Sequence, residues 1–585
     1  MPLRRATPWF LLLAAIVVCR SAVFVAWPAA HFDSDQAITG LMAKHLAEAR
    51  AFPVFWYGQT YMLAVEAWLA APLMAIAGAS VAALKLPLLA INVAIVWLLL
   101  RGLTRDAGLA AHQAAFAALF FVLAPPITAA HFLTANGGNV EPALCVLLLW
   151  TLRRRPLWMG LVLGVGFLNR EFTIYGAVAL LILDAAERRL FTPSALTRYA
   201  VAFATATAVW LAFLGLRQFS SAAGPGTSVA DLHSRLAGNN LLQVAERLCS
   251  DVPAMVVGAG RILTVHWPEL FGLEPQPLTD FGIESGVRQG LPGSAWLLLP
   301  MLALPLLDLG VRSVKRHLPG ARSVKRPLPG ARSADRPFRG QAPGAPFSRP
   351  GLDDGTAQRP GPQGAVQRPG PEHEAVQRPD PRAATVQRPG TGDTPVHRPG
   401  TGDAPDSRPD PRFPRYLIIV SALSLTGYVV GRCGAVDFYT MRYELLSVLG
   451  AAGLAARYLQ VERARALTAI WAAGCIAVFA LAAVAHVRLL NEYLTQPPVA
   501  LKRELVRALE ARGIRYGAAD YWTAYYVTFM TRERIIVTAT EIPRIKAYAR
   551  LVDEHRSEAI LISRRPCPGG DRLSPGFWQC TDTNR

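Results

Sequence analysis

The stretch HFDSDQAITGLMAKHLAEARAFPVFWYGQTYM, residues 31–62, decides how the chain is interpreted, because it directly follows the first apolar segment. Residues 8–28 are long enough to cross a bilayer at a rise of about 1.5 Å per residue. The chain then presents two acids, Asp33 and Asp35, ahead of apolar residues at helical spacing, which predict an amphipathic helix lying along the membrane interface. Acids at this point favour chemistry at a membrane surface; the alternative is that they cap the following helix.

The composition is typical of a membrane protein with many spans. Of 585 residues, 52% are hydrophobic and 17% are charged, and the mean hydropathy is +0.27. Much of the formal charge of +19 lies in one Arg/Pro-rich tract and in short loops, where basic residues orient membrane proteins. This placement argues against a nucleic-acid partner. The first segment is interrupted by Arg20 and is interpreted as a retained signal anchor.

Eleven further apolar segments follow the first one. They are residues 61–78, 81–100, 109–125, 140–152, 157–168, 172–184, 199–216, 293–310, 416–431, 444–456 and 466–488. We interpret 61–78 as an interfacial or re-entrant element, because the short basic loop Arg153–Arg155 then falls inside the cell. The sequence therefore predicts a mainly α-helical, polytopic bundle of about eleven spans with a cytoplasmic N-terminus.

The predicted organisation has four parts. They are a transmembrane catalytic part (1–310) with outer loops 29–80, 126–140 and 217–292, a tract (311–415), a second transmembrane part (416–488) and a tail (489–585). The repetitive Arg/Pro/Gly-rich tract is too polar to offset its ordering entropy, so it is predicted to be a disordered cytoplasmic loop. The tail alternates helix and strand patterns, which predicts a small extracytoplasmic α/β domain. Cys567 and Cys580 could pair there in an oxidising compartment.

Polar side chains from several loops would meet at the outer face. The candidates for acid–base chemistry are Asp35, Asp33 and Glu141. The candidates for binding the donor phosphate are Arg442, Tyr443, Arg261, His266, Arg170 and Arg432. The candidates for the acceptor cavity are Tyr57, Gln59, Tyr61 and Glu66. Glu141 follows Asn136–Val140 and equally suits the first turn of a helix. Each arginine also fits a loop salt bridge or a contact with lipid phosphate.

Motifs of several other protein classes are missing from the sequence. It contains no GxGxxG or GxxxxGK[ST] phosphate loop, no CxxC pair and no HExxH helix. A nucleotide-powered pump, a dinucleotide enzyme and a zinc protease are therefore unsupported.

In these residues the chain resembles the GT-C superfamily of polytopic glycosyltransferases. It is most similar to the family 39-like protein mannosyltransferase and aminoarabinose transferase type. The strings that carry the resemblance are DSDQAITGLMAKHL, FPVFWYGQTYMLAVEAWLAAPL, ANGGNVEP, GLVLGVGFLNREF, the RY of YTMRYELLSVLG and ADYWTAYYVTF. The resemblance covers nearly the whole chain outside 311–415.

The resemblance implies an inverting transfer of a sugar from a polyprenyl-phosphate or -diphosphate carrier. The acceptor would be a lipid, glycan or protein at the outer face of a bacterial inner membrane. Asp35 falls where the family has its catalytic aspartate, but Gln36 stands in place of the usual second acid, and Glu141 is the nearest match to an acid in the second outer loop. Carrier phosphate would fall on Arg442 and Arg261. No cofactor is certain, and a divalent metal stays open because relatives differ.

Two other functions compete with this one. The chain could be a transporter or flippase for a lipid or polyol, which charges buried along several spans would favour. It could also be a non-catalytic scaffold whose tail binds sugars through aromatic residues such as Tyr521 and Trp522. The concentration of acids at one face favours the enzyme.

Overall fold

The computed structural model describes most of the chain. The described residues are 2–59, 61–228, 248–274, 276–280, 283–307, 412–432, 438–461 and 465–580. All of them belong to one compact unit, residues 1–317 with 407–585. The second unit, 318–406, lies outside the described residues, as does the part of the tract 311–415 that precedes residue 412.

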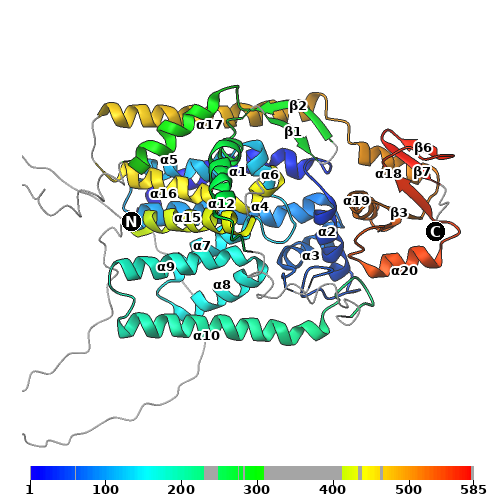
Figure 1. The fold of residues 1–585 in the computed structure, drawn as a ribbon, viewed down its shortest axis with the longest axis horizontal. Coiled ribbons are helices and arrows are strands. Elements are labelled where there is room, and N and C mark those ends of the chain that lie inside the picture. The colour runs from blue at the N-terminus through cyan, green and yellow to red at the C-terminus, as the bar shows by residue number, and fades with distance from the viewer. Residues whose placement is uncertain are drawn as a thin grey trace, which may run out of the picture. The chain divides into compact units, whose positions relative to one another are not determined.

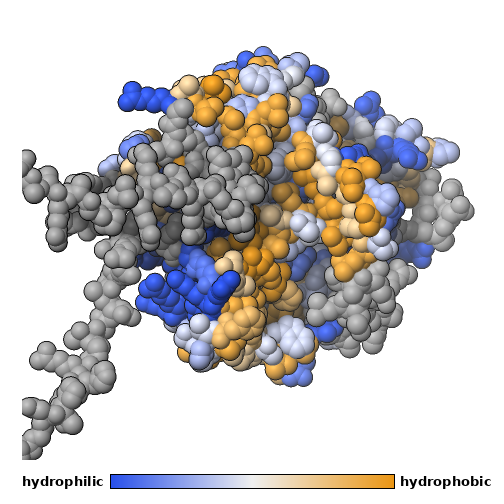
Figure 2. All heavy atoms as spheres, turned by 60° about the vertical axis from the view of Figure 1, so that its left-hand side comes forward, coloured by the Kyte–Doolittle hydropathy of each residue, from blue (hydrophilic) through white to orange (hydrophobic). Residues whose placement is uncertain are grey.

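Within the described residues, five helices are long and apolar enough to cross a membrane. They are α1 (Pro2–Ala26), α4 (Val81–Arg101, continued by η1, Gly102–Asp106), α10 (Pro193–Leu216, continued by η3, Arg217–Phe219), α15 (Arg412–Arg432) and α17 (Arg465–Thr495). Their apolar runs match the thickness of a hydrocarbon core of about 30 Å. Figure 2 shows hydrophobic side chains in broad patches over the helices of one face, as lipid contact requires.

Shorter helices pack among the long ones (Figure 1). They are α3 (Val65–Ala77), α5 (Ala111–Val122), α7 (Glu141–Leu152), α8 (Pro156–Asn169), α9 (Ile174–Ala186), α16 (Ser447–Leu459) and the turns η6 (Ser294–Leu297) and η7 (Leu299–Ala303). Each apolar segment named from the sequence overlaps one of the long helices or one of these shorter helices and turns. The mainly helical, polytopic fold is therefore confirmed.

The segment between α1 and α4 begins and ends at the same end of the bundle. The guanidinium of Arg20 in α1 donates to Asn92 Oδ1 in α4 at 2.8 Å. Farther along, Lys85 Nζ donates to the carbonyls of Ala30 at 3.0 Å and His31 at 2.8 Å. The two helices are thus antiparallel. Between them, α3 has 13 residues, which span about 20 Å, so its length agrees with an element that does not cross.

Helix α2 (Ser34–Ala47) lies between the membrane bundle and the C-terminal domain (Figure 1). It is buried on most sides, which corrects the expectation of an amphipathic helix lying on the membrane surface. The reason is that α19 (Tyr521–Met530) covers its other face. The two helices approach closely at Gly40, where an added Cβ would lie 2.5 Å from the ring of Phe529.

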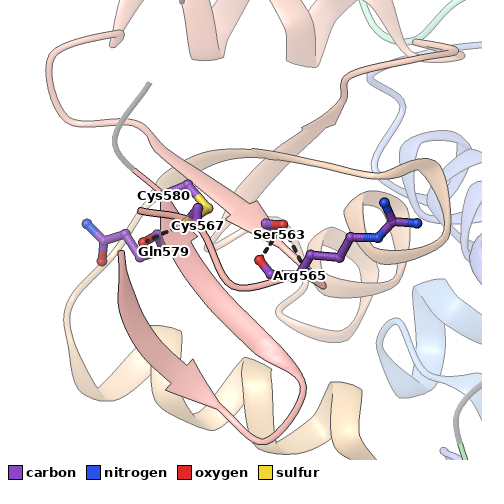
Figure 3. The surroundings of a disulfide bond; sticks show 5 residues. All are labelled: Ser563, Arg565, Cys567, Gln579 and Cys580. Carbon is purple, nitrogen blue, oxygen red and sulfur yellow. Dashed lines mark hydrogen bonds between the residues drawn. A yellow bond between two sulfur atoms is a disulfide. The ribbon is translucent and has the colours of Figure 1, made fainter. Parts of the chain in front are cut away.

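The C-terminal domain is a five-stranded sheet with three helices, as the α/β pattern predicts. Its elements are α18 (Leu501–Ala511), β3 (Tyr516–Ala519), α19, β4 (Ile536–Ala539), α20 (Lys546–Glu554), β5 (Ile560–Ser563), β6 (Asp571–Ser574) and β7 (Phe577–Cys580). The strand order is β4-β3-β5-β7-β6, with β3 parallel to β4 and β5, and β7 antiparallel to β5 and β6. The hairpin β6–β7 was not predicted. A disulfide joins Cys567 to Cys580 beside β7 (Figure 3).

The remaining elements lie in the loops. They are α6 (Pro126–His131), η2 (Glu171–Thr173), α12 (Val252–Arg261), η5 (Ile262–His266), α13 (Trp267–Leu270), the antiparallel pair β1 (Gln276–Asp280) and β2 (Ile283–Gln289), and η8 (Phe438–Glu444).

Helix α15 begins inside the tract for which disorder is predicted. Its first residue is Arg412, so the boundary expected at residue 415 is corrected. Arg412 forms an ion pair with Asp184, and the ring of Phe413 packs against Trp150 at 5.3 Å. These tertiary contacts order the end of the tract, and its composition alone does not reveal them.

Candidate active site

Asp35 lies in the first turn of α2, facing the C-terminal domain. The hydroxyl of Tyr521 donates to Asp35 Oδ1 at 2.5 Å. In the described part of the chain this is the one hydrogen bond that the carboxylate makes, which leaves Oδ2 without a hydrogen bond there. Burial, followed by the charge of Asp35, raises the pKa of Tyr521, so its phenol remains a proton donor at neutral pH.

Asp33 caps α2. Its Oδ1 accepts a hydrogen bond from the backbone N–H of Gln36 at 2.9 Å. Burial and the neighbouring charge of Asp35 raise the pKa of Asp33 to about 6, although Lys502 and Arg442 act in the opposite direction. Asp33 is thus both a helix cap and a second acid beside Asp35, so the two interpretations of the sequence do not exclude each other.

Three arginines surround the ring of Tyr443, and we call this group the arginine cluster. The guanidinium carbons of Arg170, Arg432 and Arg442 lie 5.6, 4.6 and 5.2 Å from the ring centroid. Arg170 follows α8, Arg432 ends α15 and Arg442 lies in η8, so the bundle brings together residues far apart in sequence. Burial alone would raise the pKa of Tyr443, but the three arginines lower it below its ordinary value.

Arg442 connects the arginine cluster to the two aspartates. Burial alone would lower its pKa, but Tyr443, Asp35 and Asp33 together raise it. The Arg442 side chain is therefore near enough to interact with both carboxylates and with the phenol. In such an arrangement the carboxylate can accept a proton while the neighbouring cations bind a phosphate.

Tyr61 lies next to the arginine cluster and is 44% exposed. Burial raises the pKa of Tyr61, whereas the charges of Arg170 and Arg544 lower it. Arg544, from the loop before α20, donates to the carbonyl of Gly58 at 3.2 Å. It thereby holds the turn that also carries Gln59. Tyr61 and Gln59 thus lie in a loop that the C-terminal domain contacts.

Glu66 and Glu141 form a buried carboxyl pair, and no described interaction joins either of them to Asp35. Glu66 accepts hydrogen bonds from the backbone N–H groups of Gly137 at 2.7 Å and Gly138 at 2.9 Å. Both glycines have a φ of +91°, which L-residues with a Cβ rarely adopt. The Glu141 carboxyl contacts that of Glu66. The glycine turn thus positions Glu66, and Glu141 lies beside it at the start of α7.

His266 and Arg261 differ in their surroundings. His266 Nδ1 lies 2.7 Å from Glu444 Oε1, and both side chains are fully buried. Because Glu444 directly follows Tyr443, this pair supports the arginine cluster from within the protein. Arg261 ends α12 and is exposed; among the described residues, no hydrogen bond or ion pair joins it to the cluster.

Tyr57 belongs to a buried network between α2 and the C-terminal domain. Its hydroxyl lies 3.0 Å from His45 Nδ1, and His45 Nε2 lies 2.9 Å from Glu533 Oε1. Glu533 also accepts hydrogen bonds from Tyr548 at 2.7 Å and Lys44 at 2.5 Å. Tyr57 is therefore placed behind α2, where it connects the helix to the domain that covers it.

We expect this network to stabilise domain docking in a pH-dependent manner. Burial alone would raise the pKa of Glu533, but hydrogen bonds from His45, Lys44 and Tyr548 lower it far below its ordinary value of 4.5. A lowered folded-state pKa gives stability that is present above about pH 4.5 and is lost as the pH falls further. Glu533→Gln should lower the free energy of unfolding by about 1–3 kcal/mol at pH 7, since it removes the charged acceptor of the hydrogen bonds from Lys44 and Tyr548.

Thermal unfolding of the purified full chain between pH 7 and pH 3 measures this effect. The matched control is Glu541→Gln, which changes an exposed carboxylate of the same domain. Equal stability losses for the two variants at pH 7 would contradict the role of the network.

Three residues of the C-terminal domain that lie around the site were not among the predicted site residues: Tyr521, Lys502 and Arg544. The sequence marks Tyr521 only as one of several aromatic residues in the tail, with no indication that it contacts Asp35. Lys502 is buried in α18, and its ammonium lies 5.2 Å from the ring centre of Tyr526. Local sequence offered no signal for these contacts. The tail follows the last span, which at most suggests that it lies near the outer loops.

Within the described residues, no group of three or more His, Cys, Asp or Glu side chains converges as a metal site would require.

Comparisons with known proteins return structural similarity at low sequence identity. No protein-family model and no curated protein matches the chain. The crystal structure of ArnT from Cupriavidus metallidurans bound to undecaprenyl phosphate is similar over 95% of this chain and 93% of that one, at 11% identity and a TM-score of 0.45.

Two structures of the Archaeoglobus fulgidus oligosaccharyltransferase are also similar. The apo form matches 96% of this chain and 69% of that one, at 12% identity and a TM-score of 0.43. The structure of AglB in complex with an inhibitory peptide and a dolichol-phosphate gives the same coverage and TM-score at 11% identity.

Proposed function

We propose that this protein is a GT-C-type membrane glycosyltransferase that takes its sugar from a polyprenyl-phosphate-linked donor. The observation that carries the proposal is the position of Arg442, which interacts with both aspartates and belongs to the arginine cluster. Transfer from a lipid-linked sugar phosphate needs a carboxylate that accepts a proton from the acceptor. It also needs cations that bind the phosphate as it leaves. This site has both.

In the proposed reaction, Asp35 acts as the general base. Its free carboxylate oxygen accepts the proton of an acceptor hydroxyl or amine while the acceptor atom attacks the anomeric carbon. The bond from that carbon to the phosphate oxygen breaks, and the polyprenyl phosphate leaves with the bonding electrons. The arginine cluster stabilises the charge that develops on this phosphate. Attack opposite to the leaving group inverts the anomeric centre.

The C-terminal domain takes part in this arrangement. Tyr521 fixes the orientation of the Asp35 carboxylate from outside the membrane bundle. The loop that carries Tyr61 and Gln59 supplies further polar groups for acceptor binding, whereas Glu66 and Glu141 are buried and no described interaction joins them to Asp35. Arg261 stands apart and is the weakest member of the predicted set.

A transporter is less well supported, because the charged groups buried among the spans already have protein partners. Arg20 in α1 donates to two backbone carbonyls and to Asn92. Asp184 in α9 pairs with Arg198 and Arg412. Groups tied up in this way stabilise helix packing and do not form an ion or solute pathway.

We further propose that the N-terminus is cytoplasmic and that the C-terminal domain is extracytoplasmic. The Cys567–Cys580 disulfide supports this orientation, because such bonds persist in oxidising compartments. A reporter enzyme that is active only outside the cytoplasm should be inactive when inserted near residue 350 and active when fused after residue 585. Activity at residue 350 would overturn the orientation without affecting the proposed chemistry.

The function itself is tested with the purified full chain in lipid vesicles. Radiolabelled polyprenyl-phosphate sugars are supplied with extracted envelope lipids, glycans and proteins, and label transferred to an acceptor is measured. The wild type should transfer label and Asp35→Asn should not. Failure of the wild type across a panel of donors and acceptors would count against the proposal.

A further inference from the structure

A groove runs along α17. It encloses about 820 Å³ between α17 and the segment that contains η6 and η7. Ile470, Ala477 and Val484 line it from α17, and their spacing of seven residues places them on one face of the helix. Trp296 and Pro300 line the opposite wall. We call this cavity the α17 groove.

Two arginines lie at one end of the α17 groove. Arg288, in β2, and Arg488, in α17, also line an adjoining polar cavity of about 640 Å³. Both side chains are exposed, and within the described residues neither guanidinium forms a hydrogen bond or an ion pair. Glu492 lies nearby, but one oxygen of its carboxylate accepts the backbone N–H of Gly286 at 2.6 Å.

The groove lies at the depth of the lipid chains. Residues 466–487 of α17 contain no Asp, Glu, Lys or Arg, and their length of about 33 Å matches the hydrocarbon core. Arg488 follows directly, at the level of the head groups. Figure 1 shows α17 at one edge of the bundle, with the β1–β2 hairpin beside its C-terminal half. Arg288 is thus brought to the same level by the hairpin.

We propose that the α17 groove binds a membrane lipid with an anionic phosphate head group. The phosphate lies between Arg288 and Arg488, and the hydrocarbon chain lies along the apolar wall from Val484 toward Ile470. The distance from Ile470 to Arg488 along the helix is about 27 Å, enough for a long chain. Charge complementarity selects the head group, and the apolar wall selects a lipid over a soluble phosphate.

This lipid site is separate from the candidate active site. None of its residues belongs to the arginine cluster or contacts Asp35 in the described structure. The inference therefore does not depend on the proposed transfer, and its test needs no activity measurement.

Lipid binding is measured by native mass spectrometry of the purified full chain titrated with phosphatidylglycerol. The double variant Arg288→Gln/Arg488→Gln should bind this lipid at least 10-fold more weakly than the wild type. Arg465→Gln is the matched control, since it removes an exposed arginine from the opposite end of the same helix and should bind normally. Diacylglycerol, which lacks the phosphate, should bind no better to the wild type than to the double variant.

A second pair of variants tests the chain-binding part. Ala480→Trp puts an indole into the groove and should weaken phosphatidylglycerol binding, whereas Ile476→Trp puts one on the exposed side outside it. Equal binding by the wild type, the double arginine variant and Ala480→Trp would overturn the proposal. Equal binding of diacylglycerol and phosphatidylglycerol, or displacement by soluble glycerol phosphate at lipid-equivalent concentration, would do the same.

Discussion

Asp35→Asn is expected to lower the transfer rate by about 10²–10⁴-fold, the range typical of removing a general base. Asparagine keeps the size of the side chain and can still accept the hydrogen bond of Tyr521 through its amide oxygen. It cannot accept a proton from the acceptor at neutral pH. The loss should therefore appear in kcat, with little change in the KM of the donor, when initial rates are measured with a polyprenyl-phosphate sugar.

The adjacent Asp33→Asn variant is the matched control for this result. Asparagine is as good a helix cap as aspartate, so the hydrogen bond to the Gln36 N–H is retained and folding is preserved. We expect less than a 10-fold effect on the rate. If Asp35→Asn transferred sugar at the wild-type rate, Asp35 would not be the base, even if the protein proved to be a glycosyltransferase.

Arg442→Gln is expected to raise the KM of the donor by about 10–100-fold, which corresponds to the loss of a charge-assisted hydrogen bond of about 1.5–3 kcal/mol. Arg442→Lys should recover part of the affinity for the donor, because lysine restores the positive charge but cannot form the bidentate hydrogen bonds of a guanidinium. The charge of Arg442 also lowers the pKa of Asp33, so its removal should move that pKa above about 6. The KM of donor and acceptor, measured separately in the transfer assay, distinguishes phosphate binding from general damage.

Arg261→Gln serves as the comparison for Arg442→Gln. Both residues fit the same predicted role, but Arg261 is exposed at the end of α12 and makes no described contact with the cluster. Its substitution should leave the KM of the donor within about twofold of wild type. A larger effect of Arg261→Gln than of Arg442→Gln would mean that the donor phosphate lies elsewhere.

The apolar segments could be predicted well because the signal that defines them is local. A run of apolar residues of sufficient length has few alternatives to a buried or lipid-facing helix. The α/β pattern of the tail was also recognisable from its alternating elements. The hairpin β6–β7 was missed because its first strand, DRLS, is mostly polar and lacks the apolar run that marks the other strands of the tail. The burial of α2 was missed because it depends on a domain about 490 residues further along the chain.

The sequence by itself determined the helices, the acid-bearing loop after the first span and the small tail domain, because these depend on the hydrophobicity and spacing of neighbouring residues. Only the tertiary structure decided which polar side chains meet. The contact between Tyr521 and Asp35 joins residues 486 positions apart, and the arginine cluster joins three separate segments. Such contacts depend on how whole helices pack, for which no short stretch of sequence carries a code.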